Sequence, residues 1–192
     1  MSHVYGEEIK YECDLLKPED YDALQAFSCG NVRLDSYIHK DLISHGYVDT
    51  EDGLPFKVWN VENGKIISVY SLAASGIIYK IDNYTKVLPA IKIDIFAVDI
   101  NYQKMHMDKE SELAEDRNDH VYLSDSIMCS ETIKRCRDIS EKYAAAKYIV
   151  LYADKKARRF YERNLFSDFI EFMEKEKNME ICENDPMYME LD

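Results

Sequence analysis

The sequence predicts an α/β fold built on one mixed β-sheet with helices on both faces. Two β-rich runs, residues 56–61 and 65–74, are joined by Glu62, Asn63 and Gly64, and Asn-Gly is the preferred centre of a two-residue turn, so an antiparallel hairpin is predicted. A strand, a long helix and a second strand follow between residues 90 and 153. That order predicts a parallel pair with a right-handed crossover. A sheet with both kinds of pairing is mixed.

Length and composition favour a single domain over residues 1–192. Apolar residues make up 46% of the chain, enough for a hydrophobic core. The 24 Lys and Arg against 37 Asp and Glu leave a net charge of −13, which argues against a nucleic-acid-binding surface. The exception is a local basic patch, formed by Lys155, Lys156, Arg158, Arg159 and Arg163.

The cysteines and the N-terminus indicate a cytoplasmic protein. The five Cys are odd in number, form no C-x-x-C pair and have no His at metal-ligand spacing, so we expect free thiols and no metal site. The first residues lack the apolar run of a secretory signal, and no other run is long enough to span a membrane.

Two helices come first along the chain. Pro18 and the two acids after it predict a helix that runs to about Phe27. Asn31 is expected to cap a second helix, which ends near His45 and Gly46. The apolar residues of that helix recur at helical spacing: Leu34, Tyr37, Ile38 and Leu42.

The middle of the chain carries one strand and one helix. Residues 47–54 and 75–88, on either side of the hairpin, are predicted to be surface connections. Residues 90–98 form a strand whose second half is apolar on both faces. Residues 104–120 are acidic and are predicted to be a solvated insertion. An amphipathic helix follows over about residues 124–145, with Ser124 as its N-cap.

The last third of the chain returns to the sheet. Residues 148–153 predict a buried strand and residues 155–164 a short helix, while residues 168–173 and 187–191 predict two closing strands. Two adjacent aromatic residues in the helix point about 100° apart around its axis, so one can be core and the other is available for another role.

Five segments resemble motifs of the GNAT (Gcn5-related N-acetyltransferase) family, in the family's order. The first is similar to the start of a subgroup that includes many bacterial toxin-like acetyltransferases. The segments are FSCGNVRLDSYI (27–38), VENGKIISVYSLAA (61–74), PAIKIDIFAVDINYQ (89–103), DKKARRFYERNLF (154–166) and PMYMEL (186–191). The resemblance implies a GNAT-like mixed central sheet and acetyl-CoA as co-substrate.

The resemblance also implies roles for particular residues. Tyr161 matches the tyrosine that protonates the departing CoA thiolate, and Phe160 is then its core partner. A phenol can deliver a proton at short range. Phe96, Ala97 and Val98 match the strand whose backbone pairs with the pantetheine arm of the cofactor.

The sequence departs from the family at the pyrophosphate loop. Family members follow Tyr-Gln with a glycine-rich turn at a helix N-terminus, where backbone amides bind phosphate. Here Gln103, which matches the family's cofactor-contacting Gln, precedes His106 and Asp108 at the glycine positions. If the acidic insertion loops outward, the backbone amides at the start of the next helix are expected to bind the pyrophosphate. These amides belong to Leu123, Ser124 and Asp125.

Two further departures lie near Tyr161. Asp154 stands where the family has a cofactor-contacting Asn, and Leu165 replaces the Gly before the final Phe, so Asn164 is expected to take the left-handed conformation. No general base is evident. Asp94, Glu62, a water chain and direct attack by a free amine all stay open.

Three functions stay open. The first is acetyl transfer to a primary amine on a small molecule or peptide, and the acidic chain favours a cationic acceptor. The second is a toxin-like acetyltransferase acting on aminoacyl-tRNA, with an antitoxin as partner. The third is a non-catalytic GNAT domain that binds another protein. The oligomeric state stays open as well: many relatives dimerise, and residues 174–185 could arrange an exchanged last strand in a homodimer.

Overall fold

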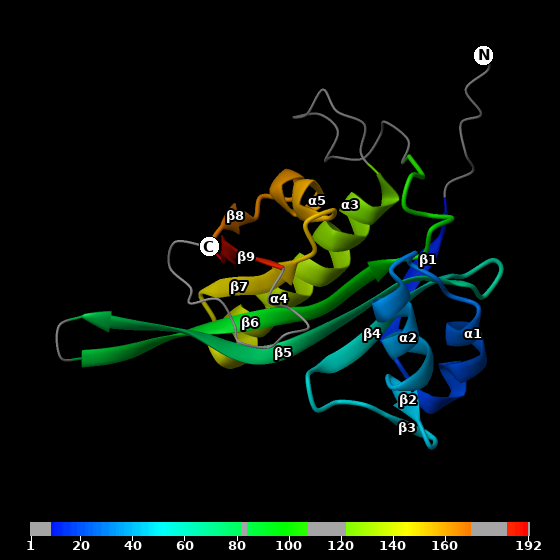
Figure 1. The fold of residues 1–192 in the computed structure, drawn as a ribbon, viewed down its shortest axis with the longest axis horizontal. Helices are drawn as coiled ribbons and strands as arrows, with labels where there is room; N and C mark the ends of the chain where they lie inside the picture. Colours follow the sequence, from blue (N-terminus) through cyan, green and yellow to red (C-terminus); the bar gives the residue numbers. More distant parts are fainter. Residues whose placement is uncertain (1–8, 82–83, 107–121, 170–183, 192) are drawn as a thin grey trace, which may run out of the picture. The chain divides into compact units, whose positions relative to one another are not determined.

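The computed structural model of the chain describes residues 9–81, 84–106, 122–169 and 184–191 (Figure 1). Its main sheet has seven strands in the order β1-β4-β5-β6-β7-β9-β8. β1 pairs antiparallel with β4, β6 pairs parallel with β7, and β9 pairs antiparallel with both β7 and β8. The sheet is therefore mixed, as predicted. No helix in the described ranges is long and apolar enough to cross a membrane.

The chain divides into two compact units, which are described separately below. The first unit comprises Met1–Ser71 and Ile95–Glu131, and the second comprises Leu72–Asp94 and Thr132–Asp192. The single domain expected over residues 1–192 stays a prediction.

The first unit begins with β1 (Tyr11–Leu15), a 3₁₀ turn (Pro18–Asp20), α1 (Tyr21–Gln25) and α2 (Val32–Lys40). Pro18 opens the first helical segment, and Asn31 caps α2 by accepting the N–H groups of Arg33 and Leu34, so both predicted helix starts are confirmed. The two helices bury their apolar residues in a core with strand residues of the same unit: Leu24, Phe27, Ile38 and Leu42 with Ile66, Val69, Ile95 and Ala97.

The end of the second helix differs from the prediction. α2 stops at Lys40, and two short strands, β2 (Ile43–Ser44) and β3 (Tyr47–Val48), pair antiparallel after it. His45 and Gly46 join them with φ values of 52° and 79°. Two consecutive positive φ values are the requirement of a two-residue hairpin turn. Gly46 therefore serves a hairpin and not a helix end, and residues 47–48 are strand and not loop.

The hairpin of β4 (Leu54–Asn60) and β5 (Ile66–Ile81) is present, but its turn is longer than predicted. The Asn60 N–H donates to the Lys65 carbonyl at 2.9 Å and the Gly64 N–H to the Asn60 carbonyl at 2.8 Å. Only Gly64 in this turn has a positive φ, 71°. Asn63 instead accepts the Lys65 N–H on its side chain at 3.0 Å. The prediction of a two-residue turn centred on Asn63 and Gly64 was wrong.

The second unit shows that residues 75–81 and 84–88 are strand and not a surface connection. β5 continues to Ile81, and β6 (Tyr84–Val98) starts soon after it, so the two strands form one long hairpin (Figure 1). Gly76 disfavours a strand in this stretch, but its β-branched and aromatic residues favour one, and they decide the outcome.

The rest of the second unit surrounds β7 (Tyr148–Ala153). It holds α5 (Arg158–Arg163), β8 (Ser167–Asp168) and β9 (Asp185–Glu190). The parallel register runs from Ala90 opposite Tyr148 to Ile93 opposite Leu151, which confirms the predicted parallel pair. Residues 174–183 of the exchange segment, residues 170–173 of the predicted strand 168–173 and the insertion residues 107–120 lie outside the described residues.

The long predicted helix is present as four consecutive helical segments. They are α3 (Leu123–Ile127), a π-helical stretch (Met128–Ile133), α4 (Lys134–Ile139) and a second π-helical stretch (Ser140–Ala144). The N-cap is Tyr122 and not the predicted Ser124, because the helix starts two residues earlier. Ser124 lies inside the first turn and is buried.

Candidate active site

Tyr161 lies on α5 in the second unit, with its ring buried and its hydroxyl open. The residue is 8% exposed, and its ring meets Phe160 and Phe166 edge-on at centroid distances of 5.1 and 5.8 Å. Within the described residues, no hydrogen bond reaches the hydroxyl, and Thr132 holds the only fully buried side-chain oxygen or nitrogen without a partner. The Tyr161 hydroxyl is therefore largely but not completely enclosed. A buried tyrosine usually finds a hydrogen-bond partner, so an open hydroxyl is unusual.

Phe160 is not the core residue of this pair, contrary to the expectation. It is only half-buried, and the Arg163 guanidinium lies 5.7 Å from its ring centroid. Tyr161 has the buried ring instead. The two side chains point in different directions, as the helical spacing requires, but the buried direction belongs to the tyrosine.

The end of α5 fixes the backbone of Tyr161. The Phe166 N–H donates to the Tyr161 carbonyl at 3.0 Å and the Leu165 N–H to the Glu162 carbonyl at 3.1 Å. These two bonds, with Leu165 at φ 71°, make a Schellman motif, and the contact of the Tyr161 and Phe166 rings is its usual apolar contact. Leu165 takes the left-handed conformation itself. The expectation that Asn164 would do so was wrong, because its φ is −90°.

Burial raises the pKa of the Tyr161 phenol above its ordinary value, and the negative charge of Asp154 adds to this effect. The phenol is therefore protonated throughout the physiological pH range. A protonated phenol can donate a hydrogen bond or a proton to an anion that forms beside it.

Asp154 shapes the turn that leads from β7 into α5. Its side chain accepts the Lys156 N–H at 2.8 Å, and its carbonyl accepts the Ala157 N–H at 2.8 Å. Asn and Asp side chains both form such a turn, so this local structure does not depend on the charge of Asp154.

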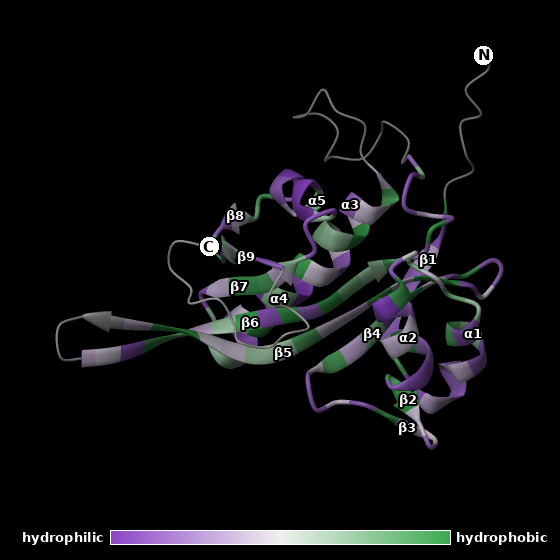
Figure 2. Ribbon diagram, in the orientation of Figure 1, coloured by the Kyte–Doolittle hydropathy of each residue, from purple (hydrophilic) through white to green (hydrophobic). Residues whose placement is uncertain are grey.

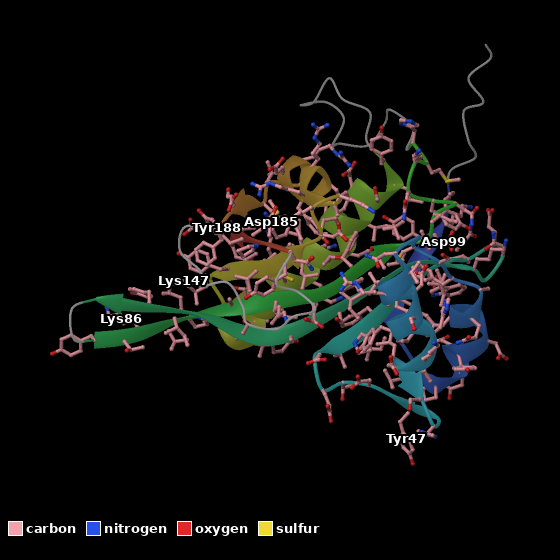
Figure 3. All side chains as sticks on the ribbon, in the orientation of Figure 1. Tyr47, Lys86, Asp99, Lys147, Asp185 and Tyr188 are labelled. Atoms are coloured by element: carbon pink, nitrogen blue, oxygen red, sulfur yellow. The ribbon has the colours of Figure 1, made fainter. Side chains whose placement is uncertain are left out.

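Arg158 connects α5 to the neighbouring strands. Its guanidinium donates to Glu162 at 2.8 Å, to Asp168 at 2.5 Å and to Asp185, labelled in Figure 3, at 3.0 Å. The charge of Arg158 therefore does not contribute to the predicted basic patch, because three carboxylates neutralise it. The described salt bridges do not involve the exposed side chains of Lys155, Lys156 and Arg159.

Neither carboxylate considered as a general base has a distinctive environment. Asp94 forms an ion pair with Lys92 at 2.5 Å, and that ammonium also lies 5.8 Å from the Tyr152 ring centroid. Glu62 is exposed in the turn of the β4–β5 hairpin. Direct attack by a free amine needs no base from either residue.

The end of β6, in the first unit, is held to β5 through serine side chains. The Ile95 N–H donates to Ser71 Oγ at 3.2 Å, and Ser68 Oγ donates to the Ala97 carbonyl at 2.8 Å. The Asp99 N–H donates to the Ile67 carbonyl, so residues 95, 97 and 99 all face β5. Alternation then directs the backbone groups of Phe96 and Val98 away from β5. That direction is the one an amide-bearing ligand needs, but the Ala97 carbonyl accepts from Ser68 and the Val98 carbonyl from Gln103.

Gln103 binds the protein itself. Its Nε2 donates to the carbonyls of Cys29 and Val98, each at 2.8 Å. The predicted cofactor residue thus connects the loop before α2 to the end of β6. Asp99, labelled in Figure 3, reinforces this connection by accepting the Ser28 N–H at 3.1 Å.

The helix start at Tyr122 has few amides left for a phosphate. The Leu123 N–H donates to the Met105 carbonyl at 2.8 Å, and the Asp125 and Ser126 N–H groups donate to the Tyr122 carbonyl. The Asp125 carboxylate accepts the Tyr122 N–H at 3.2 Å, so it lies at the helix start and opposes an anion there. Ser124 is the predicted phosphate residue whose N–H has no such bond among the described residues.

The loop before α2 is a structural feature and not a nucleophile site. Asp35 accepts hydrogen bonds from the Ser28 hydroxyl and from the N–H groups of Cys29 and Gly30. Burial and the neighbouring Asp35 raise the pKa of the Cys29 thiol to about 12, so the reactive thiolate is scarce at neutral pH.

Ser68 and Ser71, whose hydroxyls hold the end of β6, were not predicted from the sequence. Both are buried in an otherwise apolar strand. Two serines three positions apart in such a run were the available signal, because a buried hydroxyl needs a partner.

Comparisons with known proteins bear on the fold. No family model matches the chain, and no curated protein matches it by sequence. Solved structures do match: one described as a bacterial toxin has a TM-score of 0.66 at 15% identity, covering 95% of this chain and 92% of that one. The chain has a GNAT-like α/β fold.

Two further GNAT-fold structures show what such proteins are bound to. AtaTR bound with acetyl-CoA matches with a TM-score of 0.64 at 14% identity and 94% coverage of both chains. AtaT complexed with acetyl-methionyl-tRNAfMet matches with a TM-score of 0.61 at 13% identity, covering 94% of this chain and 95% of that one. At these identities the likeness establishes the fold alone, and it agrees with the toxin-like subgroup of the resemblance.

Proposed function

We propose that the protein is an acetyl-CoA-dependent N-acetyltransferase that acetylates a primary amine. The observation that carries the proposal is the open, protonated hydroxyl of Tyr161 on a ring held by Phe160 and Phe166. The Schellman motif at the end of α5 adds a fixed backbone. The proton donor is therefore held in a fixed position, as general-acid catalysis requires.

The chemistry needs one acid and a neutral amine. The amine nitrogen attacks the thioester carbonyl carbon, the carbon–sulfur bond breaks, and the sulfur leaves with the bonding electrons. Tyr161 donates its proton to that sulfur, and the proton lost by the nitrogen restores the phenol. Because the Tyr161 pKa is raised, the phenol is protonated when the reaction begins.

The end of β6 and the start of α3 are the two segments proposed to bind the cofactor, and they suit it unequally. We propose that the pantetheine arm meets the backbone of Phe96 and the Val98 N–H on the side away from β5, while the Val98 carbonyl stays bound to Gln103. The helix start suits the phosphates less well, since most of its amides are occupied and Asp125 lies there. We propose that Ser124 supplies the remaining phosphate contact, and that Gln103, Leu123 and Asp154 act by holding the surrounding backbone.

The test is calorimetric titration with acetyl-CoA, followed by an acceptor screen, for the wild type and Tyr161→Phe. We expect both proteins to bind at micromolar strength, about −8 kcal/mol. The rate constant should fall about a hundredfold to ten-thousandfold in the variant, because the proton donor is lost. Tyr143→Phe is the matched control, because Tyr143 is 82% exposed, and its rate should equal that of the wild type.

Other outcomes are informative. Binding without any turnover across a broad amine screen would favour the non-catalytic binding module. Absence of binding at millimolar acetyl-CoA would contradict the transferase proposal. An unchanged rate in Tyr161→Phe would still support an acetyltransferase, but it would show that Tyr161 is not the general acid.

A second acceptor, the amino group of an aminoacyl-tRNA, is favoured by a separate observation. Lys155, Lys156 and Arg159 are exposed on the turn and helix that carry Tyr161, and the described salt bridges do not neutralise them. A local basic surface is what a phosphate backbone requires. If this acceptor is correct, an antitoxin is the expected protein partner.

A further inference from the structure

Arg158 occupies the first position of α5, three residues before Tyr161 on the same helix. A cation at this position lies at the positive end of the helix dipole, where an acidic or neutral residue suits the helix better. The N-cap residue, Ala157, offers no side-chain hydrogen bond to the helix start. Local helix stability therefore does not explain this arginine.

The helix needs support from outside at this end. It has six residues, whereas an isolated helix shorter than about 12 residues is only marginally stable in water. Figure 2 shows α5 as mostly hydrophilic, and Tyr161 is its one buried residue. The Schellman motif fixes the C-terminal end of the helix. The orientation of Tyr161 therefore also depends on what holds the first turn.

The Arg158 guanidinium supplies that support through three nitrogen atoms. Nε donates to Glu162, one turn later on the same helix, at 2.8 Å. Nη2 donates to Asp168 of β8 at 2.5 Å, and Nη1 donates to Asp185 of β9 at 3.0 Å. Each nitrogen binds a different carboxylate, and two of the three carboxylates belong to the sheet. The single nitrogen of a lysine cannot reproduce this planar fork.

This network holds structure better than a solitary surface ion pair does. The Arg158 side chain is 29% exposed and that of Asp185 is 19% exposed. Isolated exposed pairs contribute little, because each long side chain loses freedom for one contact. Here one guanidinium serves three partners, so the same loss of freedom is shared among three contacts. Removal of the arginine would also leave three like charges close together without their common cation.

The same network also fixes a neighbour of the Tyr161 ring. Phe166, whose ring meets Tyr161 edge-on at 5.8 Å, directly precedes β8. β8 pairs antiparallel with β9, and Asp168 lies opposite the buried Met187. One guanidinium therefore joins the start of the helix that carries Tyr161 to the strand that follows Phe166.

We propose that Arg158 is a positioning residue: by joining the first turn of α5 to β8 and β9, it holds the Tyr161 ring against Phe166 and so fixes the hydroxyl. The inference rests on the proposed function, in which Tyr161 is the general acid. Arg158 acts through Tyr161 and does not touch the reacting atoms. Without the network α5 can shift, and a displacement of about 1 Å can lower a rate about a hundredfold.

The test is a double-mutant cycle of Arg158→Ala and Tyr161→Phe in the full chain, with the amine that the acceptor screen identifies. We expect Arg158→Ala to lower kcat about tenfold to a hundredfold. KM for acetyl-CoA should change less than about twofold, because the segments proposed to bind the cofactor are intact. In the Tyr161→Phe background the same substitution should lower the residual rate less than about twofold, because the group that it positions is absent.

Two further variants separate charge from geometry. Arg158→Lys keeps the charge but offers one nitrogen, so its kcat should lie between those of the wild type and Arg158→Ala. Lys142→Ala is the matched control, because it removes an ion pair, with Asp138, that lies within one helical segment and joins no strand. Its kcat should equal that of the wild type.

The position of the Tyr161 ring can be followed without any activity, by NMR of the full chain with ¹³C-labelled tyrosine rings. The Tyr161 signal is the one that Tyr161→Phe lacks, and the edge-on rings of Phe160 and Phe166 shift it. We expect Arg158→Ala to move this signal toward that of an unfolded tyrosine, while circular dichroism shows the protein folded. Arg158→Lys should move it less, and it replaces Arg158→Ala if that variant does not fold.

The outcomes that overturn the proposal differ from those that overturn the proposed function. An unchanged ring signal in Arg158→Ala, or an equal fall in kcat in both backgrounds, overturns the positioning role. If no amine is acetylated, or if Tyr161→Phe keeps the wild-type rate, the proposed function fails. The ring signal alone then decides whether Arg158 holds Tyr161 in place.

Discussion

Tyr161 combines a ring in a core position with a hydroxyl that is open for chemistry. Its aromatic neighbours exclude water from the ring, while the hydroxyl has no partner in the described part of the chain. Burial then favours the neutral phenol over the charged phenolate. The environment that holds the residue in place therefore also keeps its proton available.

This environment predicts a pH dependence of stability. The pKa of Tyr161 is raised in the folded state, whereas in the unfolded state it is about 10. Below about pH 10 both states keep the proton, and above it the unfolded state loses the proton first, so the free energy of unfolding falls. We expect a steeper fall for the wild type than for Tyr161→Phe, measured by denaturant titration between about pH 8 and 11. Equal slopes would show that burial does not hold the proton.

The element that carries Tyr161 ends in a conformation that suits its residues imperfectly. The Schellman motif places Leu165 at φ 71°, and its side chain is 66% exposed. A β-carbon is strained in the left-handed region, where glycine is not. The bonds from Leu165 and Phe166 back into the helix hold it there.

We expect Leu165→Gly to stabilise the protein by about 0.5–1 kcal/mol, because relief of the strain exceeds the greater flexibility of glycine in the unfolded chain. Leu165→Ala is the control. It keeps the β-carbon, and its unfolding free energy should stay within about 0.5 kcal/mol of the wild type. Chemical denaturation measures both changes. A destabilised Leu165→Gly would show that the exposed leucine makes a contact that matters more than the strain.

At the scale of the whole molecule, the net charge of −13 and the small basic patch have opposite effects on an anionic substrate. Diffuse negative charge repels a polyanion at long range, and salt screens this repulsion. Contacts from Lys155, Lys156 and Arg159 act at short range. The acceptor class therefore decides what removal of the patch does.

For an aminoacyl-tRNA acceptor, combined substitution of Lys155, Lys156 and Arg159 by Ala should raise KM for the tRNA and leave acetyl-CoA affinity unchanged. The salt dependence of tRNA binding should weaken by about one unit of slope for each phosphate that the variant no longer neutralises. For a small cationic amine, KM should stay unchanged. Lys134→Ala combined with Arg137→Ala, exposed bases on α4, is the control. An unchanged KM for tRNA in the triple variant would contradict a role for this patch.

Part of the site could be predicted from the sequence. The segment Phe160-Tyr161-Glu162 predicted that Tyr161 lies on a short helix, and Pro18 and Asn31 predicted two helix starts. These predictions succeeded because helix formation and capping depend on a few neighbouring residues. The structural roles of Gln103, Ser68 and Ser71 could not be predicted. Their hydrogen-bond partners are distant in sequence, and a residue type does not specify which distant carbonyl or amide it will meet.

The sequence by itself determined the mixed α/β architecture and the order of its main helices and strands, though not β1, β2 and β3, since apolar periodicity and helix caps are local properties. Only the tertiary structure decided how ambiguous residues are used. Gly46 serves a hairpin in place of a helix end, and residues 75–81 and 84–88 form strands in place of a surface connection. The buried ring of the aromatic pair belongs to Tyr161 and not to Phe160. In each case, local preference permits both outcomes, and strand pairing or burial against distant residues selects one.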